Sequence, residues 1–165
     1  MHASMNSMEQ DRTTQSLLAA GIVDIRQKLD RVPLSIVQLL ARASLATIFL
    51  RAGQAKLANW DLTIQLFANE YRVPVLPPEI AAQMALSFEL GCSVFLILGL
   101  FSRLATLPLI GMTAIIQLFV YPQIWNEHIV WLTLLFFILS RGAGLVSLDA
   151  LIARTIFKNQ AGGRR

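Results

Sequence analysis

Charged residues and cysteine are both scarce in this 165-residue chain. Asp, Glu, Lys and Arg make up 15% of it and apolar types 55%, whereas about a quarter of a soluble protein is charged. A mean hydropathy of +0.58 agrees with this, so the composition predicts a membrane protein with a single domain. Cys92 is the one cysteine, which excludes an intramolecular disulfide, a CxxC redox pair and a thiolate metal site.

Histidine is also scarce, since His2 and His128 are the only two. A haem held by two histidines would need one from a partner or a second copy, and no cluster of histidines and carboxylates indicates iron or zinc. The fourteen Lys and Arg give a net charge of +4 but form no stripe interleaved with aromatic residues. We therefore expect no metal site and no nucleic-acid partner. The histidines, carboxylates and basic residues also indicate no particular cofactor.

Long apolar runs are what the sequence has instead, at residues 34–50, 80–101, 104–120 and 124–140. A helix of about 17–25 residues spans a bilayer, so the expected fold class is all-α, an integral membrane four-helix bundle. Polar residues crowd the start of the fourth run at 126–128. Three spans with a half-inserted last helix therefore stay open as an alternative.

The flanking and connecting regions complete the expected organisation. Residues 1–33 form a cytoplasmic polar tail and an amphipathic helix, at 17–32, that lies in the membrane surface. The transmembrane domain takes residues 34–148, and its long outer loop, 51–79, is expected to form a lid over the outer mouth of the bundle. Residues 149–165 form a second interfacial helix and a basic tail.

The basic residues predict the orientation in the membrane. With four spans, ten of the fourteen Lys and Arg lie on the side of the two termini and three on the other side. Because cytoplasmic loops carry the excess of basic residues, both termini are expected in the cytoplasm. Every Trp and Tyr falls on or near the outer boundary, as an interfacial aromatic belt does.

A charged residue lies near the middle of each of the first two runs. Arg42 is at the midpoint of residues 34–50, and Glu89 lies about 2 Å from the midpoint of residues 80–101. An unpaired charge at the bilayer centre costs about 2.5–3.5 kcal/mol. We therefore predict a buried ion pair between Arg42 and Glu89 as the polar centre of the bundle.

Two interpretations of this pair remain open. It fixes the register of two helices, or it binds an anionic or quinone-like headgroup or conducts protons. Gln38, Ser93 and Gln117 are candidates to extend it into a polar network. His128 is either an interfacial residue or a quinone-headgroup or proton-transfer ligand, and Lys56 is either a snorkelling anchor or a substrate contact.

Three stretches of sequence resemble the DoxX family. They are RASLATIFLRAGQAKL at 42–57, ELGCSVFLILGLFSRLA at 89–105 and RGAGLVSLDALI at 141–152. Together they carry a resemblance over roughly residues 36–155. The chain departs from the family pattern mainly at the inner end, where Ala143 replaces a proline and Leu145 a common arginine.

The resemblance implies a four-helix, multi-pass protein of the bacterial inner membrane. It further implies a membrane subunit of a redox or quinone-linked complex, with the lipid bilayer, a partner oxidoreductase subunit or a second copy of the chain as partners and quinone as the cofactor. A non-catalytic anchor or assembly partner is the alternative, and a small transporter is the third. Catalytic residues, if the chain has any, are not identified by the resemblance.

Overall fold

The computed structural model of the protein describes Asp24 and residues 32–162, with side chains as far as residue 156. The chain divides into two units, Met1–Pro33 and Leu34–Arg165. The helix expected at 17–32 lies outside the described residues, apart from Asp24 and Val32. The second unit holds the candidate membrane spans, and its described residues form helices and no strands.

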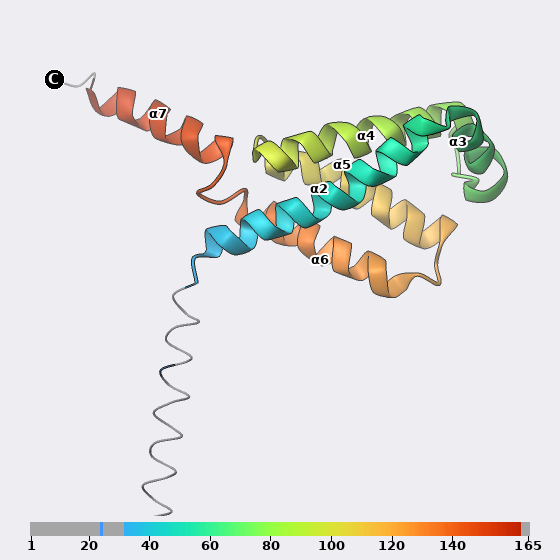
Figure 1. The fold of residues 1–165 in the computed structure, drawn as a ribbon, viewed down its shortest axis with the longest axis horizontal. Helices are drawn as coiled ribbons and strands as arrows, with labels where there is room; N and C mark the ends of the chain where they lie inside the picture. Colours follow the sequence, from blue (N-terminus) through green and yellow to red (C-terminus); the bar gives the residue numbers. More distant parts are fainter. Residues whose placement is uncertain (1–23, 25–31, 163–165) are drawn as a thin grey trace, which may run out of the picture. The chain divides into compact units, whose positions relative to one another are not determined.

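Four long helices make up most of this unit (Figure 1). They are α2 (Leu34–Ala58), α4 (Pro78–Leu98), α5 (Ser102–Ile115) and α6 (Trp125–Arg141). α2 packs against α4 and α6, and α5 packs against the same two helices. Each long helix therefore has two of the others as neighbours, and the main core lies between them.

The other helical segments stand at the two ends of these four helices (Figure 1). They are α3 (Trp60–Leu66) and the π-helical turn η1 (Phe67–Tyr71) after α2, the π-helical turn η2 (Ile116–Val120) that continues α5, and α7 (Leu148–Gly162). η1 packs against α4 and η2. The start of α7 lies at the opposite end, where the backbone N–H of Asp149 donates to the carbonyl oxygen of Gly99.

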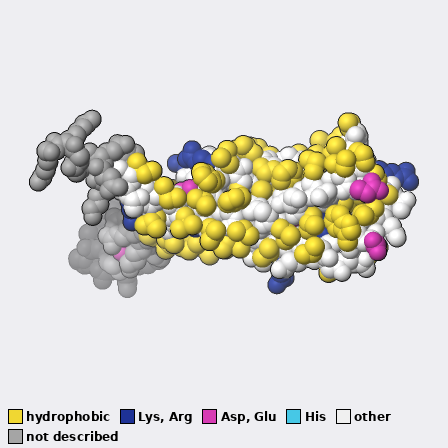
Figure 2. Space-filling view, turned by 90° about the horizontal axis from the view of Figure 1, so that it is seen from above, with side chains coloured by type: hydrophobic (Ala, Val, Ile, Leu, Met, Phe, Trp, Pro, Cys, Tyr) yellow, Lys and Arg dark blue, Asp and Glu magenta, His cyan; other side chains and the backbone are white. Residues whose placement is uncertain are grey.

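Three helical segments are long and apolar enough to cross a membrane. They are α2, α4 and the continuous segment Ser102–Val120, formed by α5 and η2. α6 is shorter, with 17 residues, and at 1.5 Å per residue it is about 26 Å long. The outer surface of these helices carries many large apolar side chains (Figure 2), as expected of helices in contact with lipid.

The first helix is longer than the apolar run that predicted it. α2 ends at Ala58 rather than at residue 50, because the polar stretch RAGQAKLA at 51–58 still consists largely of strong helix formers. The end of the apolar run thus marks a change in side-chain polarity and not the end of the helix. As a result, Lys56 belongs to the last turn of α2 and not to the outer loop.

Candidate functional site

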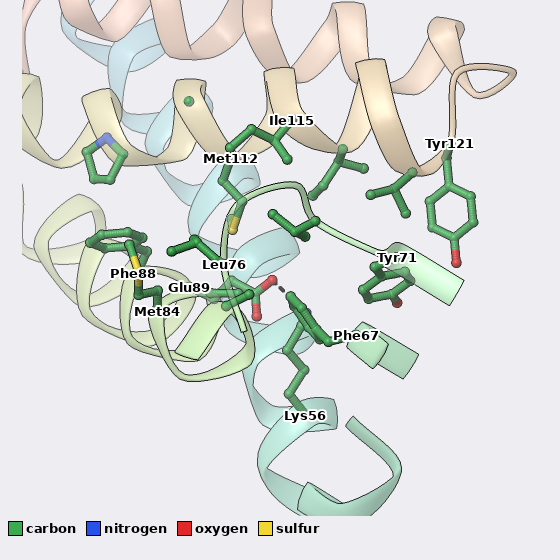
Figure 3. A pocket seen from close by; sticks show the side chains of 17 residues that line it. Lys56, Phe67, Tyr71, Leu76, Met84, Phe88, Glu89, Met112, Ile115 and Tyr121 are labelled. Atoms are coloured by element: carbon green, nitrogen blue, oxygen red, sulfur yellow. Dashed lines mark hydrogen bonds and ion pairs between the residues drawn. The ribbon is translucent and has the colours of Figure 1, made fainter. Parts of the chain in front are cut away.

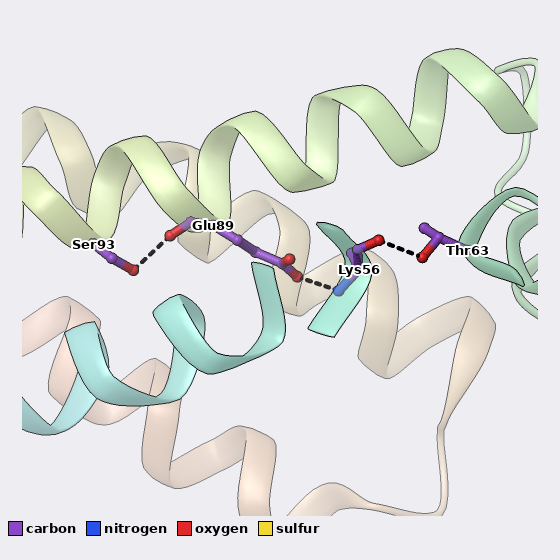
Figure 4. Close-up of polar contacts among 4 residues, drawn as sticks. All are labelled: Lys56, Thr63, Glu89 and Ser93. Carbon is purple, nitrogen blue, oxygen red and sulfur yellow. Dashed lines mark hydrogen bonds and ion pairs between the residues drawn. The ribbon is translucent and has the colours of Figure 1, made fainter. Parts of the chain in front are cut away.

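Arg42 and Glu89 are both buried, with 1% and 3% of their surface exposed. They do not pair with each other. Glu89 Oε1 lies 2.6 Å from Lys56 Nζ (Figure 4), and Arg42 Nη2 donates to the carbonyl oxygen of Val146 at 2.5 Å. The predicted ion pair between Arg42 and Glu89 is therefore wrong, although the prediction that both are buried is confirmed.

The register of α2 against α4 explains the error. A Cβ added to Gly53 would lie 3.2 Å from Glu89 Cβ, so Gly53 is the residue of α2 at the depth of Glu89. Arg42 lies eleven residues earlier, or about 16 Å along the helix, beside Gly99, which follows α4. Matching midpoints assumed that the two helices are centred on each other, whereas the first turns of α2 extend past the C-terminal end of α4.

A cavity of about 360 Å³ adjoins the ion pair of Lys56 and Glu89 (Figure 3). α4 and α5 form its walls, and η1, η2 and the loop after η1 form its outer end. Its larger side chains are apolar or aromatic: Phe67, Tyr71, Leu76, Met84, Phe88, Met112, Ile115 and Tyr121. Among the described lining residues, Lys56 and Glu89 are the charged ones, and Tyr71 and Tyr121 also carry a polar group.

One oxygen of the Glu89 carboxylate has no partner. Oε1 accepts from Lys56, but Oε2 is buried without a hydrogen-bond partner among the residues that the structure describes. A buried polar atom left in this state costs about 1–3 kcal/mol, and more when the group is charged. A ligand that donates a hydrogen bond to Oε2 removes this cost.

The mouth of the cavity lies on the apolar surface between α4 and α5. Met84 of α4 and Ile115 of α5 line the cavity, yet they are 41% and 39% exposed. Gly111, one turn before Ile115 on α5, also lines it, and a Cβ added there would meet nothing within 4 Å. In a chain whose α4 and α5 cross a bilayer, this mouth faces hydrocarbon.

The two π-helical turns meet at the outer end of the cavity. The hydroxyl group of Tyr121, which follows η2, donates to a carboxylate oxygen of Glu70 in η1. The ring of Tyr71 packs edge-on against the ring of Tyr121, with centroids 5.8 Å apart. π-helical turns often mark functional sites, and here the two turns lie against each other at one end of the cavity. The lid expected from the loop 51–79 stays a prediction.

The hydrogen bond between Tyr121 and Glu70 predicts an unusual titration. This bond, followed by partial burial, raises the pKa of Tyr121 above its ordinary value. In a Tyr71→Phe variant, Tyr121 is the only tyrosine, and ultraviolet difference spectra should show its phenol ionising well above pH ~10. Because the folded-state pKa is raised, the stabilisation is present below the ordinary pKa and is lost as pH rises through the folded value.

The matched variant is Tyr71→Phe combined with Glu70→Gln. Without the carboxylate, the pKa of Tyr121 should return toward the ordinary value of about 10. An identical titration with and without Glu70 would contradict the contact.

Gln38 and Ser93 bind backbone groups instead of the Glu89 carboxylate. Gln38 Nε2 donates to the carbonyl oxygens of Arg141 and Gly142, at 3.0 and 3.2 Å, and so connects α2 to the end of α6. Ser93 Oγ donates to the carbonyl oxygen of Glu89 within α4 at 2.5 Å (Figure 4). Neither residue lines the cavity, so neither takes the predicted place in a network around the carboxylate.

Gln117 and His128 form a separate polar cluster. His128 Nδ1 lies 2.6 Å from Gln117 Oε1, while Gln117 Nε2 donates to the carbonyl oxygen of Pro122 at 2.8 Å. Since the amide oxygen only accepts, Nδ1 is the donor in this contact. His128 is buried and packs edge-on against Trp131, and neither His128 nor Gln117 lines the cavity beside Glu89.

Arg42 belongs to the junction at the end of the helices where α7 begins. Asp149 caps the start of α5, accepting from the backbone N–H groups of Phe101 and Ser102 at 2.9 and 3.4 Å. Arg42 lies beside Gly99, whose carbonyl oxygen accepts from the backbone N–H of Asp149. Arg42 and Asp149 thereby connect α2, the start of α5, Gly99 and the start of α7, which is a structural arrangement and not a cavity.

Sequence reasoning missed the roles of Lys56 and Asp149. The signal for Lys56 was the helix-forming composition of residues 51–58, which places this lysine one turn beyond Gly53. The signal for Asp149 was its place after Ser147, at the start of an amphipathic segment. Among the described residues, no group of three or more His, Cys, Asp or Glu side chains is placed to hold a metal ion.

Comparison with known proteins agrees with the resemblance seen in the sequence. A family model described as DoxX matches residues 37–122, which include Lys56, Glu89 and every wall of the cavity. None of the curated proteins and none of the solved structures compared with the chain is a match. Three apolar helices of spanning length fit a multi-pass membrane protein, and the matched region is more than half of the sequence. The chain therefore belongs to the DoxX family.

Proposed function

We propose that this protein is the membrane subunit of a quinone-linked redox complex in the bacterial inner membrane. In this proposal α6 is a fourth, short span, and both termini lie in the cytoplasm, as the basic residues suggest. The observation that carries the proposal is the cavity beside Lys56 and Glu89. It is apolar and partly aromatic, exposed apolar side chains of α4 and α5 line it, and its charged groups form one ion pair.

A quinone has the chemistry that such a cavity selects. Its planar ring packs against aromatic and thioether side chains such as Phe88, Tyr71 and Met112. Its apolar tail leaves between α4 and α5 into the bilayer. The ring oxygens reach Lys56, whose ammonium group has three N–H donors, of which the structure assigns one to Glu89. The electrons come from or go to a partner oxidoreductase subunit, so this chain binds and orients the headgroup.

Closing the mouth of the cavity tests this function. Gly111→Phe adds a ring where the backbone has open space and where the cavity begins. We expect the purified variant to bind decylubiquinone at least about tenfold more weakly than wild type, a change of about 1.4 kcal/mol, with its helix content unchanged. Equilibrium dialysis in detergent measures the affinity.

Gly91→Phe is the matched control. Gly91 lies on α4, does not line the cavity, and also has nothing within 4 Å of an added Cβ. Its affinity should equal that of wild type. Equal affinity in the Gly111 and Gly91 variants, or no binding to wild type, would refute a quinone site in this cavity.

A non-catalytic anchor is the second candidate function, and α7 is the observation that favours it. Leu151, Ile152 and Ile156 are exposed on this helix, as on a helix that lies in a membrane surface or against another protein. If a partner protein copurifies with wild type and equally with Gly111→Phe, while no quinone is retained, the anchor role is the better account.

A further inference from the structure

We infer that the cavity prefers the reduced, dihydroxy form of a quinone, because Glu89 Oε2 accepts a hydrogen bond from a ligand hydroxyl group. The preference concerns the same cavity and so rests on the proposed quinone site. It goes further, since a site that merely holds a quinone headgroup has no reason to distinguish the oxidised from the reduced ring.

The hydrogen-bonding capacity of the site is asymmetric. Glu89 is 3% exposed, Oε1 is used by Lys56, and Oε2 is buried with no partner among the described residues. An ionised carboxylate only accepts hydrogen bonds. Ser93, one turn away, does not compete for Oε2, because its hydroxyl group donates to the Glu89 carbonyl oxygen (Figure 4). The unfilled position at the polar end of the cavity therefore requires a donor.

The two forms of a quinone meet this requirement differently. A hydroquinone hydroxyl group donates to Oε2 and accepts from Lys56 at the same time. A dione oxygen accepts from Lys56 only, so Oε2 stays unpaired or faces another acceptor. The difference is one hydrogen bond to a charged group, which corresponds to about ten- to a hundredfold in affinity.

The backbone holds the acceptor in place. Gly53 lets α2 approach α4 closely, because an added Cβ would lie 2.7 Å from a methyl carbon of Leu90 and 3.2 Å from Glu89 Cβ. Lys56 comes one turn after Gly53 and reaches Oε1 from this close approach. Glu89 lines the cavity (Figure 3), and this pairing occupies one of its two carboxylate oxygens and leaves the other without a partner among the described residues.

Three probes on the full-length protein test the preference. They are decylubiquinone, the hydroquinone made from it, and the dimethyl ether of that hydroquinone, which keeps the reduced ring but has no O–H. Dissociation constants are measured in detergent without oxygen. We expect the hydroquinone to bind about ten- to a hundredfold more tightly than the dione and the dimethyl ether to bind no better than the dione.

Variants of α4 then assign the preference to the carboxylate. Glu89→Gln introduces an amide with N–H donors, so it should weaken hydroquinone binding by about tenfold or more and leave dione binding equal or tighter. Ser93→Ala, whose hydroxyl group binds the backbone, should keep the wild-type preference.

Each outcome bears on one of the two proposals. Equal affinity for all three probes, or a dimethyl ether that binds as tightly as the hydroquinone, overturns the preference and leaves the quinone site standing. No binding of any probe, or wild-type affinity in Gly111→Phe, overturns the quinone site itself. Should Glu89→Gln fail to fold, the ether comparison on the wild-type protein still decides.

Discussion

Replacing Lys56 by methionine is expected to lower the free energy of unfolding by about 3–5 kcal/mol. The substitution leaves the Glu89 carboxylate, whose side chain is 4% exposed, without its cation. Lys56 itself is 19% exposed, so in the variant water can solvate part of the Glu89 carboxylate. We therefore expect a loss near the lower end of the range, about 3 kcal/mol. Titration of the purified protein with sodium dodecyl sulfate in mixed micelles, followed by circular dichroism, measures the change.

The double variant Lys56→Met with Glu89→Leu separates stability from binding. Apolar residues of similar size in place of a buried ion pair are often neutral or stabilising, so most of the lost stability should return. Hydroquinone binding should not return, because the acceptor is gone. A stable double variant that still binds hydroquinone would show that the ion pair only holds α2 against α4 and takes no part in binding.

Arg51→Met is the control for removing a positive charge from the same helix. Arg51 is exposed, and surface substitutions usually change stability by less than about 0.5 kcal/mol. If Lys56→Met costs no more than Arg51→Met, the ion pair with Glu89 does not stabilise the fold.

Gly99→Ala is expected to destabilise the protein by about 2–5 kcal/mol. Gly99 has φ +66°, and a left-handed conformation costs a residue with a Cβ about 1–2 kcal/mol. The added Cβ would also overlap the guanidinium group of Arg42 and lie 2.5 Å from Ser147 Cβ. The same detergent titration measures the effect.

Gly91→Ala is the matched control for this variant. Gly91 lies within α4, where an added Cβ meets nothing within 4 Å, and alanine in a helix is more stable than glycine by about 0.5–1 kcal/mol. The two variants should therefore shift stability in opposite directions. A neutral Gly99→Ala would mean that Arg42 does not pack against the turn after α4.

Hydrophobic runs predicted the class of fold because a membrane-spanning helix is recognised by the apolar side chains of its own residues, without knowledge of its neighbours. The helices α2, α4 and Ser102–Val120 begin and end near the predicted runs, apart from the extension of α2 to Ala58. The burial of Arg42 and Glu89 was predictable for the same reason, since a charge inside an apolar helix turns away from lipid.

The partners of those two charges were not predictable in this way. They depend on the register of α2 along α4. A different register would leave the hydropathy pattern of both helices unchanged. Gly53 contributes to the observed register, because α2 approaches α4 so closely there that an added Cβ would strike Leu90. That register places Lys56, and not Arg42, beside Glu89.

By itself, then, the sequence determined an all-helical membrane protein of the DoxX family with charges buried among its helices. Those properties depend on local composition and short motifs. The tertiary structure alone decided that Glu89 keeps one oxygen without a partner beside an apolar cavity and that Arg42 binds the carbonyl oxygen of Val146, shortly before α7. Those properties depend on atoms from separate helices approaching within hydrogen-bonding distance, which packing sets and sequence periodicity does not.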